Sequence, residues 1–323
     1  MSDSSELLPL VDKVLEAVES RVLGQRAACE ALLATYMAGG HALLEGVPGI
    51  GKTLLARTFA AALGLDFQRV QATPDLMATD IIGANVFDQE GKSFHLVKGP
   101  VFTQILMTDE INRTPPKTQS ALLEAMQENQ VTIDGERHAL DDDFFVIATQ
   151  NPVELEGTYP LPEAQLDRFL TRIDMGMLPA DAELELYRRA ARGDEGSWGL
   201  GRSAAESVSP VVNAEEARAL RRAARGVHVS DELLDYLTRL AGAVRNSEHL
   251  DLGISPRGGL ALLATARAAA LIEGRDYLLP DDFKRFLTAC WEHRLLLTAE
   301  AELEGHNARR VLEKVASEVE VPK

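Results

Sequence analysis

Cysteine and basic residues are scarce in this sequence. Only Cys29 and Cys290 occur among 323 residues, and they match no metal-ligand spacing, so we expect two reduced thiols in a reducing compartment. Lysine and arginine number 33 against 50 aspartates and glutamates, which gives a net charge of −17. Because nucleic-acid binding requires a basic face that neutralises phosphates, this balance argues against a DNA- or RNA-binding protein.

Long hydrophobic runs are also missing. The longest apolar stretches are interrupted by Glu30, His41 or Glu45, and none reaches the roughly 18 uncharged residues that a transmembrane helix needs. The first ten residues, MSDSSELLPL, have neither the basic nor the apolar region of a secretory signal. Apolar residues nevertheless make up 46% of the chain and charged residues 26%, as in globular proteins. We therefore expect a soluble, cytoplasmic protein that does not span a membrane and is long enough for two domains.

The first half of the chain alternates short apolar runs with helical patterns, which predicts an α/β domain with a parallel sheet. Two Gly-containing hairpins, at 85–97 and 130–140, interrupt this alternation as insertions. Thr114 is expected to cap a helix that begins at Pro115. The expected strands are 42–45, 67–71, 104–108, 144–149 and 172–175, and the expected helices are 6–21, 25–38, 52–63 and 116–128.

After Met175 the strand patterns stop, and the rest of the chain reads as helical. We expect a nucleotide-binding domain over residues 1–178 and a smaller helical domain over 179–323, with a Gly/Ser-rich loop at 193–210 inside it. The expected helices of the second domain are 179–192, 214–225, 231–246, 256–273, 280–296 and 307–319.

The segment GVPGIGKT fits the phosphate-binding pattern G-x-x-x-x-G-K-[ST], and it lies between a predicted strand and a predicted helix, as the pattern requires. A simple Gly-rich turn is the alternative, but that context argues against it. Backbone N–H groups of such a loop face phosphate oxygens. Lys52 would reach the β- and γ-phosphates of ATP, and the Thr53 hydroxyl would ligate Mg²⁺. The predicted nucleotide contacts in this segment are Gly46, Val47, Pro48, Gly49, Ile50, Gly51, Lys52, Thr53 and Leu54.

Two later strands end in polar side chains at the sheet edge where ligands of α/β proteins bind. FTQILMTDEIN ends in Asp109, which suits a contact to Mg²⁺, and Glu110, which suits activation of the attacking water. Solvated loop charges are the alternative for such a pair. FFVIATQN ends in Asn151, which could hydrogen-bond the γ-phosphate or the water; by itself it would read as a turn residue.

Two arginines also have candidate roles. Ser255 and Pro256 are expected to start a helix whose first turn contains Arg257, where a cation is disfavoured by the helix dipole. An anionic partner such as the γ-phosphate accounts for Arg257 better than an interdomain salt bridge. Arg168, in LPEAQLDRFL, could pair with Asp167 or Glu163 on spacing alone. Because Lys52, Glu110, Asn151 and Arg257 would already contact phosphate within the chain, we expect Arg168 to reach the γ-phosphate of a neighbouring copy.

These segments resemble the AAA+ ATPases, and within them the MoxR family, from VLGQ at 22–25 to WEHRLLL at 291–297. The most specific pieces are DEINRTPPKTQSALLEAMQENQVTIDG, ATQNPVELEGTYPLPEAQLDRF and GISPRGGLALL. The resemblance implies a five-stranded parallel sheet of order 5-1-4-3-2 followed by an all-α lid. It also implies that Lys52 and Thr53 belong to the Walker A motif, and that Asp109 and Glu110 belong to the Walker B motif. Asn151 would be the sensor-1 residue. Arg168 would be the arginine finger, and Arg257 the sensor-2 arginine. Val22, Leu23, Gly24 and Gln25 would line the adenine pocket, although a plain turn between helices remains the alternative.

The function that these features imply is that of a Mg²⁺-dependent ATPase that assembles into a ring, expected to be a hexamer. By resemblance it would act as a chaperone that remodels a protein client together with a von Willebrand factor A-domain partner. The hairpins would face the pore and the client, and Arg113 would face either a neighbour or solvent. The alternatives are a magnesium-chelatase-like motor subunit, a nucleotide-dependent interaction module with little turnover, and a DNA-translocating protein, which the acidic charge disfavours.

Overall fold

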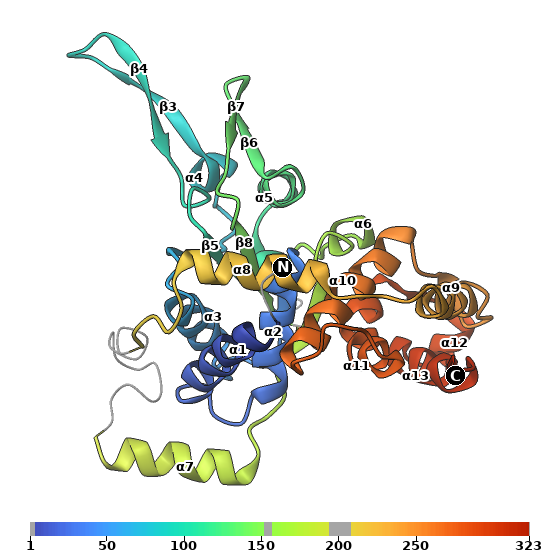
Figure 1. Cartoon of the computed structure of the whole chain (residues 1–323). Helices are drawn as coiled ribbons and strands as arrows, with labels where there is room; N and C mark the ends of the chain where they lie inside the picture. The colour runs from blue at the N-terminus through green and yellow to red at the C-terminus, as the bar shows by residue number, and fades with distance from the viewer. Residues whose placement is uncertain (1–3, 152–156, 194–207, 323) are drawn as a thin grey trace.

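The computed structural model describes residues 4–151, 157–193 and 208–322. A five-stranded parallel sheet forms the centre, in the order β2-β5-β8-β1-β9 (Figure 1). When only these five strands are numbered in chain order and the sheet is read from β9, the order is 5-1-4-3-2, as predicted. All four residues of β1 are paired on both sides, and its first three are buried, because helices cover both faces of the sheet. The strands are β1 (Ala42–Glu45), β2 (Phe67–Gln71), β5 (Ile105–Asp109), β8 (Phe145–Gln150) and β9 (Thr171–Asp174).

The helices of the first half fall close to their predicted positions, with one error at a helix start. Thr114 does not cap the helix; its hydroxyl donates to the Ile111 carbonyl at 2.7 Å, and Pro115 is the capping residue. Two prolines follow each other here, and a residue before proline is driven out of helical geometry, so the helix begins at Pro116. The helices are α1 (Ser4–Glu19), α2 (Arg26–Ala38), α3 (Lys52–Ala62), α4 (Ala78–Ile82), α5 (Pro116–Glu128) and α6 (Glu163–Leu166).

The two predicted hairpins stand outside the central sheet and project from the same end of it (Figure 1). Strands β3 (Gly83–Asp88) and β4 (Ser93–Lys98) form the longer one, and β6 (Gln130–Ile133) and β7 (Glu136–Ala139) form the shorter. Asp134 and Gly135 both have positive φ, at 49° and 86°, as a two-residue hairpin turn requires. The hairpins contact each other where the Asn85 amide donates to the Asp134 carboxylate at 3.0 Å.

The second half is mainly helical, and its helices pack against α2 and β9. Helices α8 and α10 contact α2, and α11 contacts β9. The predicted helix at 280–296 is too long: it ends at Trp291, and a 3-10 turn and a two-residue strand follow. Most of the loop predicted at 193–210 lies outside the described residues. The elements are α7 (Ala180–Ala191), α8 (Ala214–Gly226), α9 (Asp231–Arg245), β10 (Leu250–Leu252), α10 (Pro256–Ile272), α11 (Pro280–Trp291), the 3-10 turn Glu292–Arg294, β11 (Leu296–Leu297), α12 (Ala299–Leu303) and α13 (Ala308–Glu318).

One hydrophobic cluster joins the two halves of the chain. It includes Leu32 of α2, Leu44 of β1, Leu220 of α8 and Leu262 of α10, all of them completely buried. Continuous burial of this kind stabilises the placement of α8 and α10 beside α2. The C-terminal helices α9, α11, α12 and α13 therefore lie on one side of the sheet, away from α7 (Figure 1).

Both cysteines are free and buried. Burial raises the pKa of the Cys29 thiol to about 12 and that of Cys290 to about 11. The predicted reduced thiols are therefore poor nucleophiles at neutral pH. Among the described helices, none combines the length and the apolar character needed to cross a bilayer.

His41 connects three elements of the core. The Val146 N–H of β8 donates to Nδ1 at 3.0 Å, so Nε2 carries the proton and donates to the Met126 carbonyl of α5 at 2.9 Å. Burial lowers the pKa of His41 from 6.5 to about 4; the Met126 carbonyl opposes this shift, and the charges of Arg221 and Arg257 add to it. The folded state therefore keeps this ring neutral.

Acid should destabilise the protein through His41. Between pH 6.5 and pH 4 the unfolded chain binds a proton that the folded chain does not, so stability falls as the pH falls, by about 1.4 kcal/mol per pH unit. Urea unfolding between pH 7 and pH 4.5 should show a shallower loss in His41→Gln than in the unmodified protein. Equal slopes would show that His41 does not couple folding to pH.

Candidate functional site

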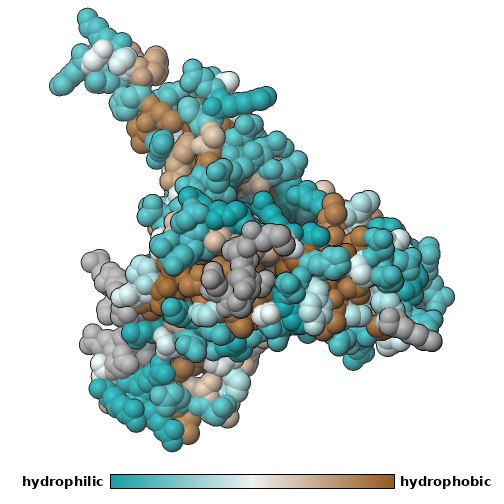
Figure 2. Space-filling view, in the orientation of Figure 1, coloured by the Kyte–Doolittle hydropathy of each residue, from teal (hydrophilic) through white to brown (hydrophobic). Residues whose placement is uncertain are grey.

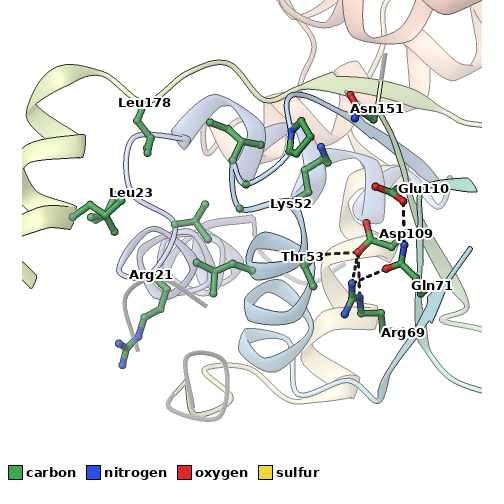
Figure 3. A pocket seen from close by; sticks show the side chains of 17 residues that line it. Arg21, Leu23, Lys52, Thr53, Arg69, Gln71, Asp109, Glu110, Asn151 and Leu178 are labelled. Carbon is green, nitrogen blue, oxygen red and sulfur yellow. Dashed lines mark hydrogen bonds and ion pairs between the residues drawn. The ribbon is translucent and has the colours of Figure 1, made fainter. Parts of the chain in front are cut away.

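A cavity of about 500 Å³ lies at the carboxyl ends of β1, β5 and β8 (Figure 3). The loop after β1 and the start of α3 form one wall, and the ends of β2, β5 and β8 form another. Residues from the α1–α2 connection and from α7 with its preceding segment complete it. The lining residues are Arg21, Val22, Leu23, Pro48, Gly49, Ile50, Gly51, Lys52, Thr53, Leu54, Arg69, Gln71, Asp109, Glu110, Asn151, Leu178 and Leu186.

The loop between β1 and α3 has the conformation that phosphate binding requires. Gly49 and Gly51 have φ of 80° and 98°, and a Cβ at either position would meet nothing within 4 Å. The inner curve of the loop is thus open for a ligand, and the positive end of the α3 dipole faces it. The residues present fit a bound phosphate chain. Gly46 and Val47 do not line the cavity; their carbonyls accept hydrogen bonds from Lys52 Nζ at 2.5 and 3.2 Å.

Lys52 is half-buried between the loop and two carboxylates. Burial lowers the pKa of its ammonium group, and the charges of Asp109, Glu110 and Glu45 oppose that shift. An incoming phosphate would act in the same direction as these carboxylates and stabilise the protonated form. Lys52 is therefore suited to move from the loop carbonyls to a phosphate oxygen.

Asp109 and Thr53 are close enough to act on one metal ion. The Thr53 hydroxyl donates to Asp109 Oδ2 at 3.2 Å, and the Thr149 hydroxyl donates to Oδ1 at 2.6 Å. Hydroxyl and carboxylate oxygens are the ligands that Mg²⁺ prefers, and this ion takes few of them from a protein beside a nucleotide. The donor set therefore fits the predicted metal ligands. Arg69 of β2 also binds Asp109, with Nη2 at 2.6 Å from Oδ2.

Glu110 follows Asp109 in the left-handed region, with φ of 59°, which turns its side chain into the cavity (Figure 3). Its N–H donates to the Thr149 hydroxyl at 2.8 Å. Gln71 Nε2 donates to Glu110 Oε2 at 3.3 Å, and Arg113 Nε lies 3.0 Å from the same oxygen. The sequence left Arg113 open between a neighbour and solvent; here it pairs with a carboxylate of its own chain.

Asn151 and half of the predicted adenine segment also lie at the cavity. Asn151 is buried and lines it from the end of β8. Val22 and Leu23 line it from the other side, whereas Gly24 and Gln25 do not. Gly24 packs against Pro179 and Ala182, and Gln25 donates from Nε2 to the Gly176 carbonyl at 2.7 Å.

Five of the residues at this cavity were not expected from the sequence. Arg69 and Gln71 lie on β2, whose neighbour in the sheet is the β5 strand that carries Asp109. The sequence does predict the strand at 67–71 and shows that its carboxyl end is polar. Together with its pairing to β5, this pattern indicates that Arg69 and Gln71 lie near Asp109. The five missed residues are Arg21, Arg69, Gln71, Leu178 and Leu186.

Arg168 and Arg257 line a second cavity, of about 310 Å³, which shares no lining residue with the first. Arg257 is therefore not at the phosphate loop of its own chain, and no described residue of α8–α13 lines the first cavity. The physical reason is the packing of α8 and α10 beside α2. The expected contact of Arg257 with the γ-phosphate of its own chain thus differs from this arrangement.

Neither arginine side chain makes a hydrogen bond or an ion pair with another residue in the described parts of the chain. The alternative of a salt bridge from Arg168 to Asp167 or Glu163 is not what the structure shows, because Asp167 pairs with Arg294 at 2.6 Å. The predicted start of α10 is confirmed: the Ser255 hydroxyl accepts from the Gly258 N–H at 3.2 Å, and Pro256 is the first helical residue. The carboxylate of Asp167 also lines this cavity, but it pairs with Arg294, so Arg168 and Arg257 share the cavity without an ion pair of their own.

Comparison with known proteins adds independent findings. The family described as ATPase family associated with various cellular activities (AAA) matches residues 41–171, and the AAA lid domain matches residues 242–315. The chain is 41% identical to the uncharacterized protein YeaC of Bacillus subtilis, over 100% of this chain and 98% of that one. It is 38% identical to Chaperone MoxR1 of Mycobacterium tuberculosis, over 97% and 82%. The crystal structure of a putative ATPase from Cytophaga hutchinsonii superimposes with a TM-score of 0.89 at 39% identity, covering 99% and 97% of the two chains.

Proposed function

The chain belongs to the MoxR family of AAA+ ATPases, and we propose that it hydrolyses ATP at a site that a neighbouring copy of the chain completes. The observation that carries this proposal is the division of the predicted groups between two cavities. The phosphate loop, Asp109, Glu110 and Asn151 lie at one, and Arg168 with Arg257 lies at the other.

The first cavity holds the groups that hydrolysis needs from its own chain. Lys52 and the loop N–H groups bind the phosphates, and Glu110 takes the proton of the attacking water. Asn151 orients the water or the γ-phosphate with its amide. Thr53 and Asp109 would hold Mg²⁺, which would neutralise charge on the phosphates.

The second cavity holds the cations that would complete the site of a neighbour. Arginines stabilise the charge that develops on the transferred phosphoryl group, and they act within a chain or from another chain. Neither Arg168 nor Arg257 forms an ion pair within the described parts of the chain, so the γ-phosphate of a neighbour is a suitable partner. One chain then offers a nucleotide site on one surface and arginines on another. Repetition of this head-to-tail contact closes a ring, and we propose a hexamer on the family resemblance.

The dependence of activity on protein concentration tests this proposal. Phosphate release from ATP per chain should rise with concentration as copies assemble, and the rise should coincide with a mass increase in light scattering in the presence of Mg²⁺ and ATP. Specific activity that stays constant while the protein remains monomeric would contradict the shared site. No phosphate release at any concentration would favour an interaction module that binds nucleotide without turnover.

Arg69 should compete with Mg²⁺ for Asp109. Because a nearby cation disfavours a second cation at the same carboxylate, Arg69→Gln should lower the Mg²⁺ concentration for half-maximal ATP binding by roughly threefold. Fluorescent-nucleotide binding over a Mg²⁺ titration measures this, with Arg222→Gln on the exposed face of α8 as the matched control. An unchanged or higher Mg²⁺ requirement would show that Arg69 does not oppose the metal.

We propose that the β3–β4 hairpin contacts the protein client. Figure 2 shows hydrophobic residues along this projecting arm. Phe87 and Phe94 are 50% and 71% exposed, with ring centroids 5.2 Å apart. Exposed aromatic pairs of this size are costly in water and typical of binding surfaces. A chaperone role and a von Willebrand factor A-domain partner are part of this proposal; the name Chaperone MoxR1 supports the former, and the family resemblance alone supports the latter.

A further inference from the structure

Arg294 is a buried arginine outside the nucleotide cavity. Its side chain is only 3% exposed, and it lies in the 3-10 turn that follows α11. A guanidinium group has five N–H donors in a fixed fork, and a buried one must find acceptors for them. The acceptors of Arg294 are the Asp167 carboxylate at 2.6 Å, the carbonyls of Asp167 and Leu170 at 3.1 Å each, the Phe169 carbonyl at 2.7 Å and the Cys290 carbonyl.

Four of these five hydrogen bonds go to the segment that carries Arg168. They bind the residue before it and the two residues after it, so the backbone is held on both sides of Arg168. His293 adds a contact between Nε2 and the Phe169 carbonyl at 3.1 Å, and the Phe169 side chain is completely buried. The Arg168 side chain itself takes no part in this network. The segment is thus fixed while its arginine remains available.

Arg294 also supports the helix start that carries Arg257. A Cβ added to Gly258 would lie 3.2 Å from Arg294 Cδ and 2.8 Å from the Ile254 side chain, which explains a glycine after Arg257. The Trp291 indole N–H donates to the Gly258 carbonyl at 2.8 Å. Both arginines, and Arg294 itself, line the second cavity. The Arg294 side chain therefore contacts both the segment that carries Arg168 and the helix start that carries Arg257.

We infer that Arg294 is a positioning residue: it fixes Arg168 and Arg257 relative to each other and makes the place of both depend on the helical lid. This inference rests on the proposed function, because it assigns a role in presenting arginines to a neighbour. A preorganised group accelerates a reaction far more than a mobile one, and a displacement of about 1 Å can cost roughly a hundredfold in rate. Arg294 acts through its own chain on the nucleotide of the next one.

Lysine cannot replace this arginine. Arg294→Lys keeps the charge but offers three donors from one atom, so it cannot reach carbonyls on both sides of Arg168. We therefore expect that Arg294→Lys leaves Arg168 and Arg257 poorly positioned for the neighbouring nucleotide, although the charge of the lid is unchanged.

Mixtures of two inactive chains test the inference. An Arg168→Ala chain has a complete nucleotide cavity but lacks the arginine finger. A Glu110→Gln chain keeps the arginine finger but lacks the general base. Together they should recover ATP turnover at their mixed contacts. Arg294→Lys placed in the Glu110→Gln chain should lower the recovered turnover at least tenfold. The same change placed in the Arg168→Ala chain should lower it less than twofold, because that chain no longer presents Arg168.

The difference between the two placements of Arg294→Lys distinguishes a positioning role from a general effect on folding. Equal losses in both placements, or no loss in either, would overturn the role of Arg294 while the proposed shared site stands. Absence of recovery in the parent mixture would instead overturn the shared site, and the inference with it. Arg239→Lys, an exposed arginine of α9, is the matched control and should change nothing.

A second variant keeps the test decisive if Arg294→Lys does not fold. Asp167→Asn removes the charge that pairs with Arg294 at a side chain that is 26% exposed, and it keeps an acceptor oxygen. In the Glu110→Gln chain it should lower the recovered turnover about threefold, since one charge-assisted hydrogen bond is weakened. Thermal unfolding of each chain shows whether it is folded. No loss with a folded Asp167→Asn chain would overturn the inference.

Discussion

Glu110→Gln should bind ATP with nearly unchanged affinity and hydrolyse it at least a hundredfold more slowly. Glutamine has the size of glutamate and can still accept the hydrogen bond from Gln71, but it cannot take a proton from water. General bases contribute about 10²- to 10⁴-fold to rate, which sets the expected loss. Equilibrium binding of labelled ATP and single-turnover hydrolysis measure the two quantities separately.

Two other variants sharpen this prediction. Lys52→Ala should weaken ATP binding itself, because it removes the cation that reaches the phosphates. Glu313→Gln, on the exposed face of α13, removes a carboxylate far from the cavity and should change neither quantity. Normal hydrolysis by Glu110→Gln would show that another group activates the water, and the assignment of the base would fail.

Arg168→Ala should bind ATP within about twofold of the unmodified protein and lose roughly a thousandfold in turnover, the lower range of measured arginine-finger effects. Binding survives because Arg168 does not line the cavity of its own chain. Turnover falls because the neighbour loses the cation that stabilises charge in its transition state. The measurements are the same binding and turnover assays, made at a concentration where the chains are assembled.

A loss of ATP binding together with turnover would contradict this division of labour. Arg222→Ala, which removes an exposed arginine of α8 paired with Glu215, is the matched control and should retain both. Full turnover by Arg168→Ala would show that Arg168 is not a finger.

The sheet and the phosphate site could be predicted because local patterns determine them. The positions of the five strands and the strand–loop–helix context of Lys52 follow from short apolar runs and a glycine pattern, whereas the order of the strands was implied by the family resemblance. The side to which the lid docks could not be predicted. It depends on burial of α8 and α10 against α2, a contact between residues far apart in sequence. Arg257 was for that reason expected at the phosphate loop of its own chain, whereas it lines the second cavity.

Arg294 was missed for a similar reason. In the sequence it continues a helical pattern that was expected to run to residue 296, where an arginine reads as a surface residue. The helix ends at Trp291, and the turn that follows buries Arg294 against Asp167 and Phe169. The folded contact between α6 and the 3-10 turn shows this role.

We propose that the arginine of one chain acts on the nucleotide of the next. Turnover measured over mole fractions of Arg168→Ala and Glu110→Gln chains tests it most directly. A productive contact needs one of each chain, so turnover should rise from both pure samples to a maximum near equal amounts. Turnover that stays at the level of the pure chains at every ratio, or that changes along a straight line between them, would contradict the account.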